Sequence, residues 1–436
     1  MVIAGISFLL RSVMLRSAEG VFPLGEISER VRDFYDRRPY PPPMESLAEY
    51  RRHWQDYQRR RVDFHLYWPD LDYREDLTIL IAGCGTSQAA KYALRWPAAQ
   101  IIGIDCSATS VQYTERLKRE HNLNNLHVYQ LPIEQVGTLN KSFDQVVCTG
   151  VLHHLAEPVS GLSALRGVLK AGGAMHVMVY APYGRTGVYM LQEFCRRLGI
   201  EDTDIGVREL IIALEALPAG HPLQHLLMTS PELRDEATIA DALLHPNDRS
   251  YSVPQLFDLI REAGLTFGRW LRQAPYSVHC GVIAKIPQAR DLLCLPLEEQ
   301  YAAVELFRGT MIRHSAILYH VGSGLTQPVN FVGHNWLEYV PIRLSDSVCI
   351  QDRLPSGASA VLINRSHTSR DLFLPIGPTE ERLFHVVDGH NSIADIAEIA
   401  LESSARAAHI EMMGKFFERL WWHDIVVFGT GHARTP

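Results

Sequence analysis

The middle of the chain alternates between short apolar runs and stretches with apolar residues at helical spacing. The apolar runs cover residues 78–82, 100–104, 127–129, 145–148 and 175–180. Strands that alternate with helices form a parallel sheet with right-handed crossover connections. We therefore expect an α/β domain whose core is a doubly wound, mostly parallel sheet.

This alternation stops after Tyr180, and residues 186–250 carry helical patterns with polar breaks. A connection of that length is longer than an α/β unit requires, so we expect a helical insertion that caps a substrate. The alternation then resumes with a helix capped by Ser252. Strands are predicted after it at residues 265–271 and 278–285, which would complete a seven-stranded sheet.

We place this domain at residues 76–286. The segments before and after it do not show its alternation of strands and helices. Residues 1–75 are expected to form an N-terminal helical segment or lid, interrupted by the proline-rich run at 39–43. Residues 287–334 are predicted to link the domains through a long helix at 298–320. Residues 335–436 are predicted to form a smaller α+β domain of the winged-helix-like kind, with helices at 379–387, 393–401 and 410–422 and a strand at 425–428.

Composition narrows the class of protein. A chain of 436 residues exceeds one domain of about 100 to 200 residues. The net charge of -7 and the lack of a dense Lys/Arg stripe give no electrostatic case for nucleic acid. Seven scattered cysteines without a C-x-x-C pair indicate a reducing cytoplasm. The apolar run near the N-terminus is too short for a membrane span, although a targeting segment within residues 1–20 stays open.

A glycine-rich turn follows the first strand of the expected sheet. Glycines at 83 and 85 let the chain turn sharply, and they let a ligand approach the amides at the start of the next helix. The second strand ends in Asp105, which is placed to accept hydrogen bonds from ribose hydroxyls. Gln88 stands where a dinucleotide-binding loop has its third glycine, so the loop fits S-adenosylmethionine (SAM) better than a nicotinamide cofactor.

With these motifs the chain resembles the class I SAM-dependent methyltransferases over residues 77–181. The matching segments are Gly83-Cys84-Gly85-Thr86, Asp105, residues 131–136, 143–148 and 150–155, and the turn at 169–173. The resemblance implies that the glycine turn holds the methionine part of SAM, and that Asp105 holds its ribose. The cofactor-binding residues that it implies are Ala82, Gly83, Cys84, Gly85, Asp105, Cys106, Ile133, Glu134 and Cys148. The chain departs from the family where Ile81 replaces an acid, where Ser87 replaces a third glycine, and near Pro132, where an expected acid is missing.

Candidate catalytic and substrate residues follow the fourth and fifth strands. His153 and His154 lie where the transferred methyl group would point, and either imidazole can remove a proton from an acceptor. Packing or helix capping is the alternative role for both. Tyr35, Tyr40, Tyr183 and Arg185 are expected to contact the substrate. No H-x-x-x-H or H-x-H pair has a carboxylate nearby, so no metal site is expected.

The predicted activity is methyl transfer from SAM to an oxygen or nitrogen atom of a small metabolite or natural product. Two alternatives stay open: a peptide or protein methyltransferase, and a SAM-binding regulator without turnover. The first alternative rests on residues 383–393, which resemble the winged-helix-like peptide-binding domains of ribosomal peptide modification. Such a domain can dock a peptide, form a homodimer or complete the substrate pocket.

Overall fold

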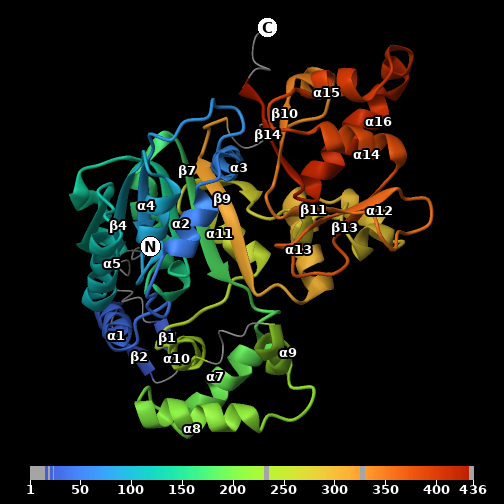
Figure 1. The fold of residues 1–436 in the computed structure, drawn as a ribbon. Helices are drawn as coiled ribbons and strands as arrows, with labels where there is room; N and C mark the ends of the chain where they lie inside the picture. The colour runs from blue at the N-terminus through green and yellow to red at the C-terminus, as the bar shows by residue number, and fades with distance from the viewer. Residues whose placement is uncertain (1–14, 18–19, 23, 230–234, 325–328, 432–436) are drawn as a thin grey trace, which may run out of the picture.

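The computed structural model describes residues 15–17, 20–22, 24–229, 235–324 and 329–431 (Figure 1). Apart from a short hairpin of β1 (Leu15–Ser17) and β2 (Gly20–Phe22), the stretch considered as a targeting segment lies outside these residues. Among the described helices, none is both long and apolar enough to span a membrane.

A seven-stranded sheet forms the centre of the molecule, in the order β5-β4-β3-β6-β7-β9-β8. Its first five strands along the chain are parallel, and β9 runs antiparallel to both of its neighbours. The expectation of a doubly wound, mostly parallel sheet is thereby confirmed. The strands are β3 (Thr78–Ala82), β4 (Gln100–Asp105), β5 (Leu126–Gln130), β6 (Phe143–Thr149), β7 (Leu169–Tyr180), β8 (Leu265–Trp270) and β9 (Arg313–His320).

The seventh strand of the sheet lies later in the chain than the sequence pattern predicts. Residues 282–285 form one 3-10 turn, so the predicted strand at 278–285 is wrong. The helix predicted at 298–320 is present only as far as Arg308, because residues 313–320 form strand β9. Helix α12 (Ala289–Leu293) and helix α13 (Leu297–Arg308) come before β9, and Gly309 ends α13 with a φ of +61°. A short apolar run such as 316–319 fits a buried strand as well as a helix. The sheet therefore extends beyond residue 286.

Side chains that alternate along the strands belong to two hydrophobic cores, one on each face of the sheet. Leu80 and Ile102 point into a core shared with α6 (Pro158–Gly167) and α11 (Val253–Glu262). Ile79 and Ile101 point into a second core. It is shared with three helices, α3 (Tyr57–Tyr67), α4 (Gln88–Arg95) and α5 (Ala108–Glu120). Two further N-terminal helices, α1 (Leu24–Arg37) and α2 (Ala48–Trp54), contact α5 and α4 respectively.

Two further units extend from the sheet (Figure 1). The insertion consists of α7 (Thr186–Leu198), α8 (Asp204–Glu215), α9 (Pro222–Thr229) and α10 (Glu236–Leu244), and it has its own apolar core. The C-terminal unit, orange to red in the figure, also has its own core. Its helices and last strand lie close to the predicted positions, whereas its winged-helix-like character stays a prediction. It contains β10 (Val340–Arg343), β11 (Ser347–Ile350), β12 (Ala360–Asn364), β13 (Phe373–Ile376), α14 (Pro378–Val386), α15 (Ile393–Ala400), α16 (Ser403–Trp422) and β14 (Val426–Gly429).

Candidate functional site

A cavity of about 1060 Å³ opens at the carboxyl ends of the parallel strands and continues over one face of the sheet. Its first half is lined by the glycine turn, the end of β4 and residues 130–135. Its second half lies between α2, α3 and α4 and the strands β7 and β9, and residues 344–346 of the C-terminal unit reach it. Carboxyl strand ends are where open α/β sheets bind their ligands.

The glycine turn has the conformation that its sequence predicts. Gly83 and Gly85 have φ angles of +72° and +52°, which are unfavourable for residues with a side chain. A Cβ atom on Gly85 would lie 2.7 Å from the carbonyl oxygen of Tyr40. The turn is therefore closely packed against the segment that joins α1 to α2. Thr86 strengthens this contact, since its hydroxyl donates a 2.7 Å hydrogen bond to the Pro41 carbonyl.

Asp105 connects the second strand to the glycine turn. Its Oδ2 accepts a hydrogen bond of 2.8 Å from the Gly85 amide, and its Oδ1 accepts one of 2.9 Å from the Ser107 amide. Burial raises the pKa of Asp105 to about 6. Each carboxylate oxygen has a second lone pair, so the group can still accept hydrogen bonds from a ligand. Cys106, Ile133 and Glu134 also line the cavity, and their role in cofactor binding stays a prediction.

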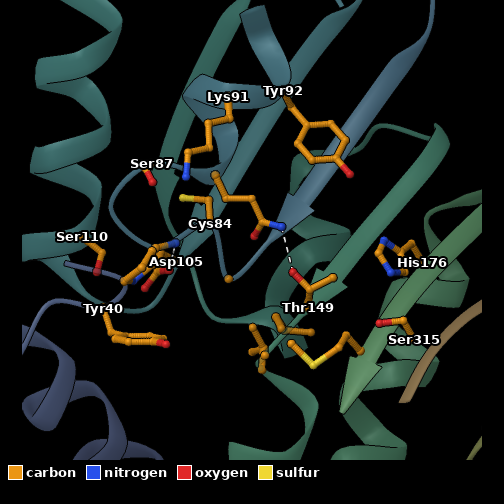
Figure 2. Close-up of a pocket in the computed structure, with 18 of the residues that line it drawn as sticks. Tyr40, Cys84, Ser87, Lys91, Tyr92, Asp105, Ser110, Thr149, His176 and Ser315 are labelled. Atoms are coloured by element: carbon orange, nitrogen blue, oxygen red, sulfur yellow. Dashed lines mark hydrogen bonds between the residues drawn. The ribbon is translucent and has the colours of Figure 1, made fainter. Parts of the chain in front are cut away.

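Figure 2 shows the polar groups between the two halves of the cavity. Gln88 Nε2 donates a 2.8 Å hydrogen bond to the hydroxyl of Thr149, at the end of β6. The ring of Tyr40 lies beside Asp105. Tyr35 also lines the cavity, and its hydroxyl donates a 3.1 Å hydrogen bond to Asp241 of the insertion. Both tyrosines therefore line the cavity, and their contact with a substrate stays a prediction.

Five of the expected site residues do not line the cavity. Ala82 and Cys148 are fully buried in the core, where the alternation of strand side chains turns them away from the ligand space. Tyr183 is 41% exposed, because the Gly184 amide donates to the Met311 carbonyl and holds this loop against β9. The side chains of Cys148, expected to bind the cofactor, and of Tyr183, expected to contact the substrate, therefore lie outside the cavity lining.

The remaining two expected site residues that do not line the cavity are Arg185 and His153, and both are buried. The Arg185 guanidinium carbon lies 3.6 Å from the centre of the Tyr180 ring, so this arginine packs on an aromatic face and does not reach the substrate space. The His153 ring lies 4.2 Å from the Tyr180 ring and 4.1 Å from that of His154. Burial lowers the pKa of His153 well below its usual value, which favours a neutral packing residue.

His154 does line the cavity. Its Nδ1 donates a 2.9 Å hydrogen bond to the Asn247 carbonyl, which leaves the lone pair on Nε2. His245 lies against it with ring centres 3.8 Å apart, and Asp241 is close enough to interact electrostatically. Burial raises the pKa of Asp241 to about 6. Of the two histidines predicted to be catalytic, the structure therefore places only His154 at the cavity.

This cluster contains side chains that metals commonly bind. The candidate ligand atoms of His153, His154 and Asp248 lie within 4.8 Å of one another, and so do those of His154, Asp241 and His245. Two imidazoles on one tetrahedral metal ion would have ring centres about 5 Å apart, whereas the ring centres of His154 and His245 are 3.8 Å apart and the rings are tilted by 32°. The geometry favours packing, and the absence of a metal site stays a prediction.

Several cavity residues were not singled out from the sequence. Lys91 of α4, His176 of β7 and Ser315 and Arg313 of β9 all line the second half. A polar His176 within an apolar strand was the only signal available, because the faces of β7 and β9 become known only once the two strands are paired.

Comparison with known proteins agrees with this geometry. Residues 80–175 match the methyltransferase domain family. An uncharacterized protein of Synechococcus sp. is 34% identical over 251 residues, which are 55% of this chain and 59% of that protein. The tRNA U34 carboxymethyltransferase of Shewanella denitrificans is 35% identical over 99 residues, 22% of this chain and 30% of that enzyme. The chain thus spans less than two thirds of either relative.

Among solved structures, PKMT2 from Rickettsia typhi has a TM-score of 0.63 at 15% identity, covering 89% of this chain and 77% of that one. The same protein in complex with AdoHcy has a TM-score of 0.60. At this identity the likeness shows the fold. The fold and the family match together identify the central part of this chain as a class I methyltransferase domain.

Proposed function

We propose that the protein is a SAM-dependent methyltransferase that methylates an oxygen or nitrogen atom of a small metabolite or natural product. The observation that supports this most is the continuity of the cavity, which joins the glycine turn and Asp105 to a separate chamber beside β7 and β9. Ligand cavities usually measure about 300 to 1000 Å³. A volume of about 1060 Å³ is enough for a cofactor and an acceptor together.

In this proposal the first half of the cavity binds the cofactor. The glycine turn would lie against its methionine part, and Asp105 would accept hydrogen bonds from its ribose hydroxyls. The amides of Gly83 and Cys84 already donate to the Ile104 carbonyl. Ile81 is fully buried and supplies no carboxylate for the ammonium group. Gln88 can replace it, because its Nε2 is bonded to Thr149 while its Oε1 stays available as an acceptor.

The chemistry then requires little from the protein beyond alignment. The sulfonium supplies an activated methyl group, so holding the acceptor in line and excluding water can provide most of the rate. The acceptor would use its lone pair to bond the methyl carbon, and the pair of the broken C–S bond would stay on sulfur. His154 Nε2, or a water molecule at the cavity wall, takes the proton that the acceptor loses.

The direct test is to incubate the protein with SAM and pools of small metabolites and to measure S-adenosylhomocysteine. Product above background, lost in Asp105→Ala, is the expected result. A chain that binds SAM by calorimetry but forms no product with any pool would be a regulator, and this proposal would then be wrong.

A peptide acceptor is the second candidate, and one observation favours it. Residues 344–346 of the C-terminal unit line the cavity, so a peptide bound to that unit could reach the cofactor half. Peptide pools in the same assay test this candidate. A tRNA acceptor, suggested by the name of the Shewanella relative, has less support, because the net charge is -7.

A further inference from the structure

The second half of the cavity, between α4, β7 and β9, carries uncompensated positive charge. Lys91 and Arg313 line it, and Arg272 joins them from the segment after β8. Within the described residues, no ion pair links any of these three to an acid. Arg95 differs, because Asp63 Oδ2 lies 3.1 Å from its guanidinium and Tyr50 accepts a second hydrogen bond. The charge of Arg95 is therefore already balanced.

Two strands direct polar side chains toward this chamber. Tyr180 pairs with Arg313, Met178 with Ser315 and His176 with Ile317. Because side chains alternate along a strand, residues 176, 178 and 180 of β7 share a face with 313, 315 and 317 of β9. Figure 2 shows the ring of His176 next to Ser315.

His176 is buried without a hydrogen-bonding partner. It is only 8% exposed, and neither ring nitrogen has a partner anywhere in the described part of the chain. Burial, together with the nearby charges of Arg95, Arg313 and Arg272, lowers its pKa to about 3. The ring is therefore neutral at physiological pH and presents one N–H donor. Buried polar groups of this kind normally have a partner, which indicates that a ligand supplies one.

The acids of the cavity do not balance this charge. Asp63 is occupied by Arg95, which leaves Asp346 as the carboxylate at the C-terminal edge of the chamber. Asp105 and Glu134 lie on the side of the glycine turn, Glu29 belongs to α1, and Asp241 lies in the histidine cluster. An acceptor that enters the chamber thus meets more positive than negative groups.

We propose that this chamber binds an anionic group of the methyl acceptor, a carboxylate or a phosphate, with Lys91 and Arg313 supplying charge and His176 a hydrogen bond. The identity of the ligand as methyl acceptor rests on the proposed function, whereas the binding of an anion does not. An anion beside β7 and β9 would pair with Arg313 and with the orphaned imidazole, and hydrogen bonds between ionised groups are the stronger kind. Lys91 adds positive charge from α4, and in Figure 2 it reaches toward Ser87 at the end of the chamber nearer the glycine turn. The acid group would anchor the acceptor away from Thr149 and leave its reactive atom near the glycine turn.

A titration of the full chain tests this proposal without any methyl transfer. The probes are benzoate and phenyl phosphate, with benzamide as the neutral analogue. Binding is followed through the ring signal of isotopically labelled His176, which is assigned by its loss in His176→Asn. We expect saturable shifts with at least one acid and none with benzamide, and the stronger probe shows whether carboxylate or phosphate is preferred.

Charge-neutralising variants make the test specific. Lys91→Gln and Arg313→Gln should each weaken probe binding at least fivefold, and Arg313→Lys should recover most of the loss. Lys141→Gln, on an exposed loop, is the matched control and should bind as the wild type does. Thermal unfolding checks that the variants are folded.

The proposal is overturned if no probe gives a saturable shift, if benzamide binds as well as benzoate, or if the control loses as much affinity as the chamber variants. Failure of the proposed function would appear differently, as anion binding without any S-adenosylhomocysteine formed from acidic or neutral metabolites.

Discussion

The backbone amide of Gly85 donates a hydrogen bond of 2.8 Å to the carboxylate of Asp105, so the glycine turn and the end of the second strand are physically joined. The proposed ribose contact depends on this acid. Asp105→Ala should weaken SAM binding about tenfold to a hundredfold, because hydrogen bonds to a charged group contribute about 1.5 to 3 kcal/mol. Calorimetry measures the change. Asp33→Ala, at an exposed position of α1, is the control, and equal affinity in both variants would contradict the assignment.

The close approach of Gly85 to Tyr40 gives a second prediction. Gly85→Ala introduces a Cβ at a φ of +52° and 2.7 Å from the Tyr40 carbonyl oxygen. It should cost about 1 to 3 kcal/mol of stability and weaken SAM binding at least tenfold, since the turn must move. Denaturant unfolding and calorimetry measure the two effects. Gly172→Ala, where a Cβ has no neighbour within 4 Å, should change neither.

His153 and His154 should respond differently to substitution. His154→Gln should lower kcat at least tenfold and leave SAM affinity unchanged, because His154 lines the cavity and can take the acceptor proton. His153→Ala should mainly lower stability, by about 2 kcal/mol, because its ring is fully buried against Tyr180. Steady-state kinetics and unfolding separate the two. Normal turnover in His154→Gln would show that water, and not His154, takes the proton that the methyl acceptor loses.

The buried Asp241 predicts a pH dependence of stability. Burial raises its pKa from 3.8 to about 6, so the folded state binds the proton more tightly than the unfolded state does. Stability is therefore lost as the pH rises from about 4 to 6, and the loss is complete above that range. Asp241→Asn lacks this loss and should become more stable relative to the wild type over the same interval, by about 2 kcal/mol. Denaturant unfolding at several pH values measures it, and a difference independent of pH would show that the carboxyl is not perturbed.

The close packing of the His154 and His245 rings leads to a prediction about metals. Purified protein dialysed against a chelator should keep its activity, and elemental analysis before dialysis should find well below one zinc, iron or manganese ion per chain. A stoichiometric metal whose removal abolishes turnover would show that the histidine cluster rearranges to bind it.

Local pattern was sufficient for much of the fold and for the cofactor half of the site. The strands β3 to β7 follow from apolar runs between amphipathic helices, and the turn at 83–85 follows from glycines between a strand and a helix. These features depend on neighbours a few residues away, so their signals lie within short windows of the sequence. The position of Asp105 at the end of β4 can likewise be predicted from a short window of sequence.

Tertiary structure decided the rest, because it depends on contacts between distant segments. Whether residues 313–320 were strand or helix was settled by their pairing with β7 and β8. The same pairing turned His176 and Arg313 toward the cavity, while the alternation of β6 turned Cys148 into the core. Sequence patterns were enough to predict a class I methyltransferase domain with a glycine turn. Packing of the strands, the N-terminal helices and the C-terminal unit determined which side chains face the acceptor, because a strand's buried and open faces are defined only by what packs against them.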